Sequence, residues 1–275
     1  MAKQSGYRKH ASKLFGGPHK THDREIMESM RYAGLIQRAL LPSDHQLKKL
    51  LDQYFILFMP KSIVSGDFYW ITQKNRQTYI VVADCTGHGV PGALMSILGI
   101  SFLNEIIKNG TSTTAGRILN KLREKVMEAL NQTGNFNESK DGMDISLCIF
   151  NYDKSRMQFA GANNPVYIIR DNVIQETIPD KMPVGINAIH EEPFSSHEID
   201  IFRNDVIYMF SDGFADQFGG PESRKFKYGP FRQLLLDIYK KDMDDQQLIL
   251  RQTIEDWMGQ NEQVDDILVM GFKIL

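Results

Sequence analysis

The stretch that decides the fold is Ile80-Val81-Val82-Ala83-Asp84-Cys85-Thr86-Gly87-His88-Gly89-Val90-Pro91-Gly92-Ala93. Its first four residues are apolar, and three of them are β-branched, which is typical of a strand. Asp84 ends this strand, the glycines after it permit a tight turn, and Pro91 suits the first position of a helix. The residues that follow, as far as Ile107, are apolar on nearly every side of a helix. We therefore expect a strand, a short loop and a buried helix that Gly110 ends.

Strand and helix patterns continue on both sides of this stretch. A polar turn at 73–77 predicts a hairpin with the strand before it. The other expected strands are 54–59, 68–71, 145–150, 157–160, 166–169, 173–177, 194–201, 206–210 and 267–274. The other expected helices are 115–130, 230–239 and 244–257. Clusters of strands with pairs of helices between and after them predict an α+β fold in which helices cover sheets.

The N-terminal region divides at residue 23. Residues 1–22 contain no Asp or Glu and several Lys and Arg, which predicts a basic, disordered tail. From residue 23 to 41 the period of the apolar residues predicts a connector helix that Pro42 ends: Ile26, Met30, Ala33, Ile36 and Leu40. This helix either packs on the domain that follows, residues 42–275, or carries a signal from an upstream module or a second subunit. The residues alone leave both interpretations open.

The overall composition is that of an ordinary globular chain. Hydrophobic residues make up 42% and charged residues 24%, and the net charge of -2 gives the chain as a whole no attraction for nucleic acid. Two cysteines, Cys85 and Cys148, are too few for a disulfide scaffold and indicate a reducing cytosol. No uncharged apolar run is long enough to span a bilayer. We therefore expect a cytoplasmic protein, or the cytoplasmic piece of a larger membrane-anchored chain.

Aspartates stand at the ends of several expected strands. Asp67 precedes one, Asp84 and Asp212 each follow one, and Asp265 with Asp266 precedes the last. Carboxylates at strand ends can share one cleft, where they repel each other unless cations neutralise them. Hard divalent ions such as Mg²⁺ or Mn²⁺ take oxygen ligands, and two such ions can activate a bridging water. Any one of these aspartates alone is more often a turn residue, so the prediction rests on all of them together.

At this point the sequence resembles the SpoIIE/RsbU-type protein serine/threonine phosphatases, a branch of the PPM superfamily. The resemblance covers roughly residues 33–275, and its motifs occur in the family's order. They are Ser65-Gly66-Asp67-Phe68-Tyr69, Ala83 to Ala93, Gly161-Ala162-Asn163-Asn164-Pro165, Met182-Pro183-Val184-Gly185, Phe210-Ser211-Asp212-Gly213 and Asp265-Asp266-Ile267. The fold that the resemblance implies is a PPM-type αββα sandwich, with two mostly antiparallel sheets flanked by helices and an N-terminal regulatory helix.

The resemblance also implies a metal site and a substrate. Two Mn²⁺ or Mg²⁺ ions are expected, with Asp84 bridging both, and with Asp67 and the backbone carbonyl of Cys85 on one of them. Asp212 and Asp265 are expected on the other ion, with Asp266 as the neighbour that could replace Asp265. The implied substrate is phosphoserine or phosphothreonine on a signalling protein, usually a STAS-type anti-sigma-factor antagonist. The implied role of the N-terminal helix is regulatory, and a homodimer through it is plausible.

The expected chemistry is hydrolysis by the metal-activated water, without a covalent phosphoenzyme. The thiol of Cys85 is therefore not a nucleophile, because it lacks the phosphate-cradling context of a cysteine phosphatase. In relatives from the wider superfamily a histidine two residues after the bridging aspartate can act as an acid, but here that residue is Thr86. His88 stands four residues on and is expected to be structural, and Lys61 is expected to be a solvated surface charge.

Two motif positions depart from the family pattern, and two other functions remain alternatives. Ser65 replaces the usual glycine, so the local turn is expected to differ, and Trp70 stands where an acidic residue is common. A two-metal nucleotide cyclase is one alternative, because Ser65-Gly66-Asp67 superficially resembles the Gly-Gly-Asp signature of diguanylate cyclases. That signature should lie at a hairpin tip and be followed by an acidic residue, whereas Phe68 follows here. A catalytically inactive regulatory module is the other alternative, although all four aspartates are present.

Overall fold

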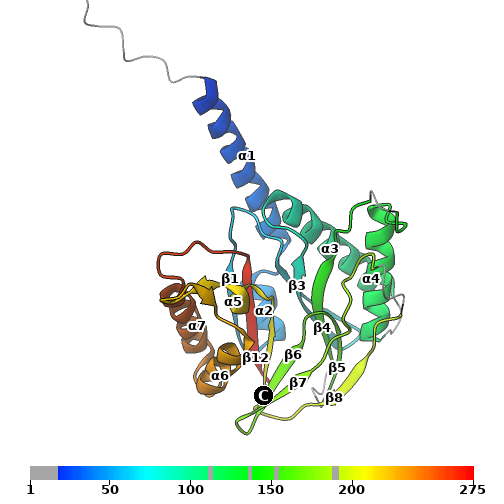
Figure 1. Ribbon diagram of the computed structural model, residues 1–275. Helices are drawn as coiled ribbons and strands as arrows, with labels where there is room; N and C mark the ends of the chain where they lie inside the picture. The colour runs from blue at the N-terminus through cyan, green and yellow to red at the C-terminus, as the bar shows by residue number, and fades with distance from the viewer. Residues whose placement is uncertain (1–17, 111–113, 136–137, 152–154, 188–191) are drawn as a thin grey trace, which may run out of the picture.

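The protein is described here from a computed structural model, which covers residues 18–110, 114–135, 138–151, 155–187 and 192–275. Two five-stranded antiparallel sheets form its centre (Figure 1). The first has the order β1 (Gln53–Met59), β12 (Ile267–Lys273), β9 (Val206–Phe210), β6 (Val166–Arg170) and β7 (Val173–Thr177). The second has the order β2 (Phe68–Lys74), β3 (Gln77–Cys85), β4 (Met143–Asn151), β5 (Arg156–Ala162) and β8 (His197–Asp200).

Helices cover the outer face of each sheet. The helices α3 (Val90–Asn109) and α4 (Ala115–Ala129) share one apolar core with the inner strands of the second sheet. The helices α6 (Tyr228–Ile238) and α7 (Met243–Met258) share another with the first sheet. A third core lies between the two sheets and includes Ile80, Val82, Phe150, Met209 and Phe272. Because side chains alternate across each strand, the central strands of both sheets are buried on both faces, while the edge strands β7 and β8 are partly exposed. The αββα prediction is confirmed.

Helix α3 is the helix that the opening stretch of sequence predicts. It is 20 residues long, and Pro91 lies in its first turn. Among the described residues it is the one helix long and apolar enough to cross a membrane, although half of that stretch is buried inside the domain. Its buried side faces the second sheet, while Val90 and Leu94 remain exposed. The helix is therefore half covered rather than buried on every side, and its burial is that of a core helix.

The N-terminal helix begins earlier than the sequence predicts. Helix α1 spans Pro18–Leu40, so the tail that was expected to reach residue 22 is helical over its last five residues. The remainder of that tail, residues 1–17, lies outside the described residues. Figure 1 shows α1 projecting from the domain, with only its C-terminal half against α3. Proline is tolerated in a first helical turn, which is why Pro18 does not prevent this start.

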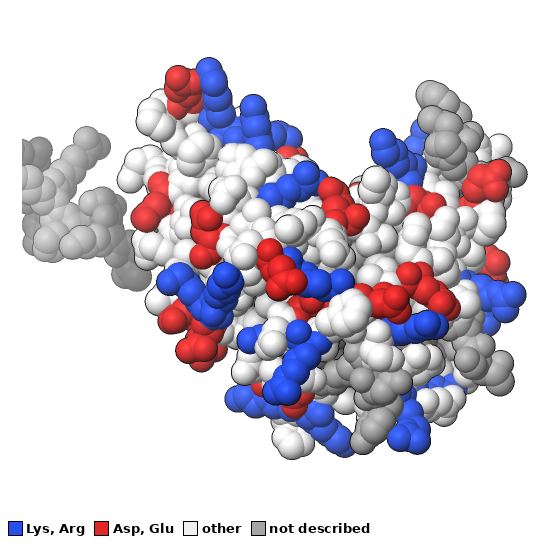
Figure 2. Space-filling model, turned by 90° about the horizontal axis from the view of Figure 1, so that it is seen from below, with Lys and Arg blue, Asp and Glu red and all other residues white. Residues whose placement is uncertain are grey.

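Several short elements have too little periodicity to be seen in the sequence. Helix α2 (Asp44–Leu50) follows Pro42 and begins with a capping box, in which Ser43 and Gln46 satisfy each other's backbone amides. Helix α5 (Gly213–Asp216) follows β9, and the two-residue strands β10 (Phe218–Gly219) and β11 (Arg224–Lys225) come after it. Seen from below, the surface is notched between two lobes, and acidic and basic side chains are mixed across this face (Figure 2).

Candidate metal centre

Asp84 faces a second aspartate across the β3–β4 ladder. In the strand register Asp84 is opposite Asp144, and both side chains are half-buried. The Nδ2 of Asn163 donates a hydrogen bond of 2.8 Å to Oδ1 of Asp144. Burial, followed by repulsion from Asp67, Asp212 and other carboxylates, raises the pKa of Asp84 to about 11. Asp84 therefore lies at the centre of a group of negative charges.

Asp67 is the most deeply buried of the predicted ligands. It is 1% exposed and lies just before β2, where its Oδ2 accepts a hydrogen bond of 2.6 Å from Oγ of Ser211. Burial raises its pKa well above the usual value, and the Ser211 bond opposes that shift. Since Ser211 immediately precedes Asp212, this bond joins the ends of β2 and β9, which belong to different sheets.

Asp212 is the N-cap residue of the short helix α5. Burial, then repulsion from Asp216 and Asp265, raises its pKa to about 6, and a hydrogen bond with Asp84 partly opposes this. The carboxyl groups of Asp84 and Asp212 are therefore neighbours, although they come from different sheets.

The neighbours Asp265 and Asp266 have different surroundings. Asp266 is 2% exposed, and its two carboxylate oxygens accept hydrogen bonds of 2.7 Å from the backbone N–H groups of Lys61 and Gly66. Asp265 is half-exposed, and its charge raises the pKa values of Asp67, Asp84 and Asp212. Asp266 therefore holds the loop before β2 in place. The carboxylate of Asp265 lies close enough to the other three carboxyl groups to repel them.

Glycines let these motifs approach each other. A Cβ on Gly66 would lie 2.6 Å from the carbonyl oxygen of Gly87 and 3.0 Å from that of Cys85, and one on Gly92 would lie 2.2 Å from the oxygen of Gly87. A Cβ on Gly213 would lie 1.9 Å from the oxygen of Asp266. Each glycine beside an aspartate motif thus packs against the backbone of another motif. The contact at Gly66 also places the Cys85 carbonyl oxygen beside the Asp67 loop.

Helix α1 reaches the same loop through Gln37. The buried side chain of Gln37 donates to the Ser65 carbonyl oxygen at 2.6 Å and to Ser96 Oγ at 2.8 Å, and it accepts from the Ser65 N–H at 3.0 Å. Ser65 has no left-handed backbone, and its Oγ accepts from the N–H of Asp67. The serine that replaces the usual glycine therefore fits this turn without strain.

The remaining residues singled out in the sequence have different surroundings. His88 is exposed in the loop between β3 and α3, and Lys61 contributes its backbone N–H to Asp266. Trp70 donates from its indole to Asn104 of α3. The β2–β3 hairpin turns at Asn75 and Arg76, eight residues beyond Asp67. The hairpin-tip position that a cyclase signature needs is therefore not the position of Asp67.

The charge of this cluster is not balanced within the described chain. No ion pair of Asp67, Asp84, Asp144, Asp212 or Asp265 with Lys, Arg or His is found among the described residues. In the same residues no three His, Cys, Asp or Glu side chains are already gathered around one point as a finished metal site. Oxygen donors with raised pKa values and no cationic partner fit hard divalent cations, which neutralise them. The side chains have the right chemistry for such ions.

Three residues near the cluster were missed in the sequence. Asp144 lies at the start of a strand rather than its end, and its signal is the pattern Gly142-Met143-Asp144 before an apolar run. Ser211 and Gln37 carry no signal of their own, because a serine beside an aspartate and a glutamine on an amphipathic helix are common. Their roles come from hydrogen bonds to residues that are distant in the sequence. Ser211 bonds Asp67, which is 144 positions away, and Gln37 bonds Ser65, which is 28 positions away.

Comparison with known proteins points to one family. The family model described as Stage II sporulation protein E (SpoIIE) matches residues 74–275, a range that holds Asp84, Asp212 and Asp265 and begins after Asp67. Phosphoserine phosphatase RsbU of Bacillus subtilis (strain 168) is 24% identical over 199 residues, which are 70% of this chain and 55% of RsbU. This chain thus spans about half the length of that curated relative.

Solved structures share the fold over most of the chain. The SiaA-PP2C domain of Pseudomonas aeruginosa is 30% identical, with a TM-score of 0.82 over 92% of this chain and 99% of that one. The PP2C phosphatase domain of SpoIIE from Bacillus subtilis, solved with a fragment of its regulatory domain, is 17% identical. Its TM-score is 0.66 over 81% of this chain and 63% of that one, a likeness of fold alone.

Proposed function

Because the chain belongs to the SpoIIE family, we propose that it is a metal-dependent protein phosphatase that hydrolyses phosphoserine or phosphothreonine on a signalling protein. The observation that carries the proposal is the cluster of Asp67, Asp84, Asp212 and Asp265. These four come from strand ends in both sheets and have no cationic partner among the described residues. An inactive module would have no reason to keep such a repulsive group.

Two Mn²⁺ or Mg²⁺ ions are the proposed cofactors. Asp84 would bridge them, Asp67 and the Cys85 carbonyl would hold one, and Asp212 with Asp265 would hold the other. We assign the last place to Asp265 rather than Asp266, because both oxygens of Asp266 already accept backbone N–H groups. The ions would supply a water of lowered pKa as the nucleophile and would neutralise the phosphate oxygens.

The chain's own groups fit a reaction without a covalent intermediate. The Cys85 thiol is buried, and burial together with the charge of Asp84 raises its pKa, so it is a poor nucleophile. The side chain of Cys85 faces the apolar core beneath β3, while its carbonyl oxygen lies toward Gly66. The role assigned to Cys85 therefore uses its backbone and leaves its side chain replaceable.

The proposed substrate class is a phosphoserine-bearing STAS-domain protein. Support comes from the family resemblance and from RsbU, whose name describes a phosphoserine phosphatase. The test is release of phosphate, with and without Mn²⁺, from phosphorylated STAS-domain proteins and from a phosphoserine peptide. Incubation with GTP in the same buffer tests the cyclase alternative. Metal-dependent release from the peptide with none from any STAS protein would remove the substrate assignment and keep the enzyme class.

Helix α1 is the proposed regulatory and dimerisation element. Large apolar side chains are exposed along it: Ile26, Met27, Tyr32, Leu35, Ile36 and Leu40. Its C-terminal half is joined to the Asp67 loop by the Gln37 hydrogen bonds, so a shift of α1 would displace a proposed ligand. Sedimentation of the wild type and of Ile36→Asp tests the dimer, which Ile36→Asp should weaken. A wild type that sediments as a monomer at all concentrations would end this part of the proposal.

A further inference from the structure

Asn164 carries a buried hydrogen-bond donor with nothing to bind. The residue is 5% exposed, and its Nδ2 is the one buried side-chain nitrogen or oxygen without a partner among the described residues. Buried amides elsewhere in the domain are fully used. Gln246, for example, donates to the carbonyl oxygens of Tyr239 and Lys241 and accepts from the hydroxyl of Tyr208. An orphan donor costs folding free energy, so its presence calls for an explanation.

The strand registers place Asn164 beside the aspartate cluster. Oγ of Ser146 donates to the carbonyl oxygens of Asn164 and Pro165, and Asp144 lies two residues along β4 from Ser146, on the same face. On the other side, Val166 of β6 is opposite Met209 of β9, so the chain just before Val166 approaches Ser211 and Asp212. Asn164 therefore lies where the chain passes from one sheet to the other, at the end of the sandwich that holds the carboxylates.

The neighbouring amide shows what Asn164 lacks. The Nδ2 of Asn163 donates to Asp144, so one of the two asparagines already serves the cluster in the protein alone. No acceptor among the described residues takes the Nδ2 hydrogens of Asn164. The missing acceptor is therefore an oxygen that the chain itself does not supply. Nδ2 has no solvent-accessible surface in the metal-free chain, so such an oxygen can reach it only if the amide turns when the ion binds.

We propose that Asn164 is a positioning residue of the metal centre, whose side-chain amide donates to a water ligand of a divalent ion held by the aspartates. The inference rests on the metal-dependent function proposed above. Magnesium and manganese ions in proteins usually keep several waters, and hydrogen bonds to such ligands orient them. A donor that is unpaired in the metal-free chain and paired after metal binding adds to the affinity for the ion. Asn164 would thus link metal binding to the joint between the two sheets.

The test compares Asn164→Leu with Gln246→Leu, a control that removes a buried amide whose bonds are all made. Thermal unfolding of the metal-free proteins should show Asn164→Leu at or above the wild-type midpoint, since only an unpaired donor is lost, and Gln246→Leu well below it. Calorimetric titration with MnCl₂ should show the Kd raised about tenfold or more in Asn164→Leu, the range for groups behind metal ligands. The Kd of Gln246→Leu should equal that of the wild type. Asn164→Ala, which is smaller, controls for the shape of leucine.

Three results are decisive. A wild-type Kd for Mn²⁺ in both Asn164 variants would overturn the inference and leave the proposed function standing. Equal destabilisation of the metal-free protein by Asn164→Leu and Gln246→Leu would also overturn it, because the donor would then have a partner within the chain. A wild type that binds no Mn²⁺ would overturn the proposed function together with the inference.

Discussion

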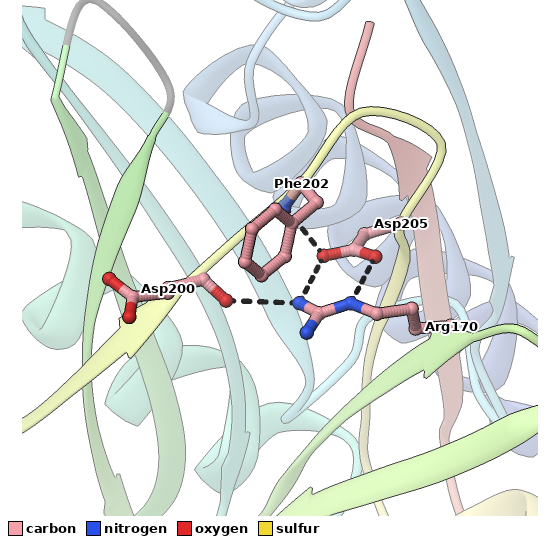
Figure 3. Close-up of polar contacts among 4 residues, drawn as sticks. All are labelled: Arg170, Asp200, Phe202 and Asp205. Atoms are coloured by element: carbon pink, nitrogen blue, oxygen red, sulfur yellow. Dashed lines mark hydrogen bonds and ion pairs between the residues drawn. The ribbon is translucent and has the colours of Figure 1, made fainter.

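Two regions of this domain bury carboxylates, and they do so in opposite ways. At the end of the sandwich near the β6–β7 turn, Asp205 is 1% exposed and forms a two-pronged ion pair with Arg170, at 2.8 Å and 2.7 Å (Figure 3). Arg170 also donates to the Asp200 carbonyl oxygen and stacks on Phe202, 4.2 Å from its ring centre. At the aspartate cluster no such cation is found among the described residues.

The two regions differ in whether the chain itself supplies the cation. The carboxylate of Asp205 accepts hydrogen bonds from the Phe202 N–H as well as from Arg170, and its carbonyl oxygen accepts from the N–H of Ile274, beyond β12. The charge of Asp205 is therefore neutralised within the chain. At the cluster, burial and repulsion between carboxylates raise the pKa values of Asp67, Asp84 and Asp212, and the rest of the fold must offset this cost. Buried charge that the chain does not neutralise is the mark of a site whose counter-ion comes from outside.

The largest effect is expected from neutralising the cluster. Asp84→Asn and Asp212→Asn should each abolish Mn²⁺-dependent phosphate release, a loss beyond the roughly 10- to 100-fold typical of groups behind the ligands. The metal-free proteins should be at least as stable as the wild type, because a source of repulsion is gone. Cys85→Ser is the control and should keep most activity, since its role uses the carbonyl. Loss of activity in Cys85→Ser as severe as in Asp84→Asn would contradict the ligand assignment.

At the Arg170–Asp205 ion pair, removal of a charge is expected to destabilise the folded chain. Arg170→Met leaves Asp205 buried without its cation, and breaking a buried pair in this way typically costs about 3–5 kcal/mol. Because the Arg170 side chain is 24% exposed, we expect the lower end of that range in urea unfolding. The double variant Arg170→Met/Asp205→Asn should recover part of the loss. Affinity for Mn²⁺ should not change in either protein, and a large change would show that the two regions are coupled.

The close packing of the motifs gives the next effect. Gly213→Ala would place a Cβ 1.9 Å from the carbonyl oxygen of Asp266, so either α5 or the loop before β12 must move. Overpacking of this kind costs about 1–3 kcal/mol, and here it should also weaken Mn²⁺ binding, since Asp212 and Asp265 are displaced. Gly229→Ala is the matched control, because a Cβ there meets nothing within 4 Å. Equal behaviour of the two variants would mean that the approach of Gly213 to Asp266 is not required.

The sequence predicted the fold well because its signals are local. Two strands, 173–177 and 206–210, have the bounds that their apolar patterns predict, and Pro91 and Gly110 mark the ends of α3. Helix α2 was missed because seven residues show little periodicity, although its capping box at Ser43 is readable. The early start of α1 was missed because residues 18–22 carry no apolar stripe to extend the pattern.

The site was only partly within reach of the sequence. Positions at strand ends predicted where the four aspartates lie, since a strand fixes the direction of the residue that follows it. The distinction between Asp265 and Asp266 could not be predicted, because it depends on the N–H groups of Lys61 and Gly66, about 200 residues away in sequence. Asp144 and Asn164 required the strand registers, and Gln37 required the packing of α1. A contact between residues that are distant in the sequence produces no pattern that can be recognised in one sequence, whereas the periodicity of a helix or a strand does.

The smallest effect concerns pH, and we expect it at the aspartate cluster. The pKa of Asp212 is raised from 3.8 to about 6 in the folded chain, so the folded state binds more protons and metal-free stability falls as pH rises through that range. Between pH 5 and 7 the loss from Asp212 should be about 1 kcal/mol, and Asp84, whose folded pKa lies above this whole range, adds to the fall in stability throughout it. Saturating Mn²⁺ should reverse the trend, because the ions bind the deprotonated carboxylates. Arg170, whose pKa is raised further by Asp205, stays charged over this pH range, so it contributes no pH dependence to the stability.

The pH dependence of stability can be measured from urea midpoints of the wild type and Asp212→Asn at pH 5, 6, 7 and 8, with EDTA and with Mn²⁺. A metal-free stability that rises with pH, or the same slope in Asp212→Asn, would show that the cluster is already neutralised by the chain itself.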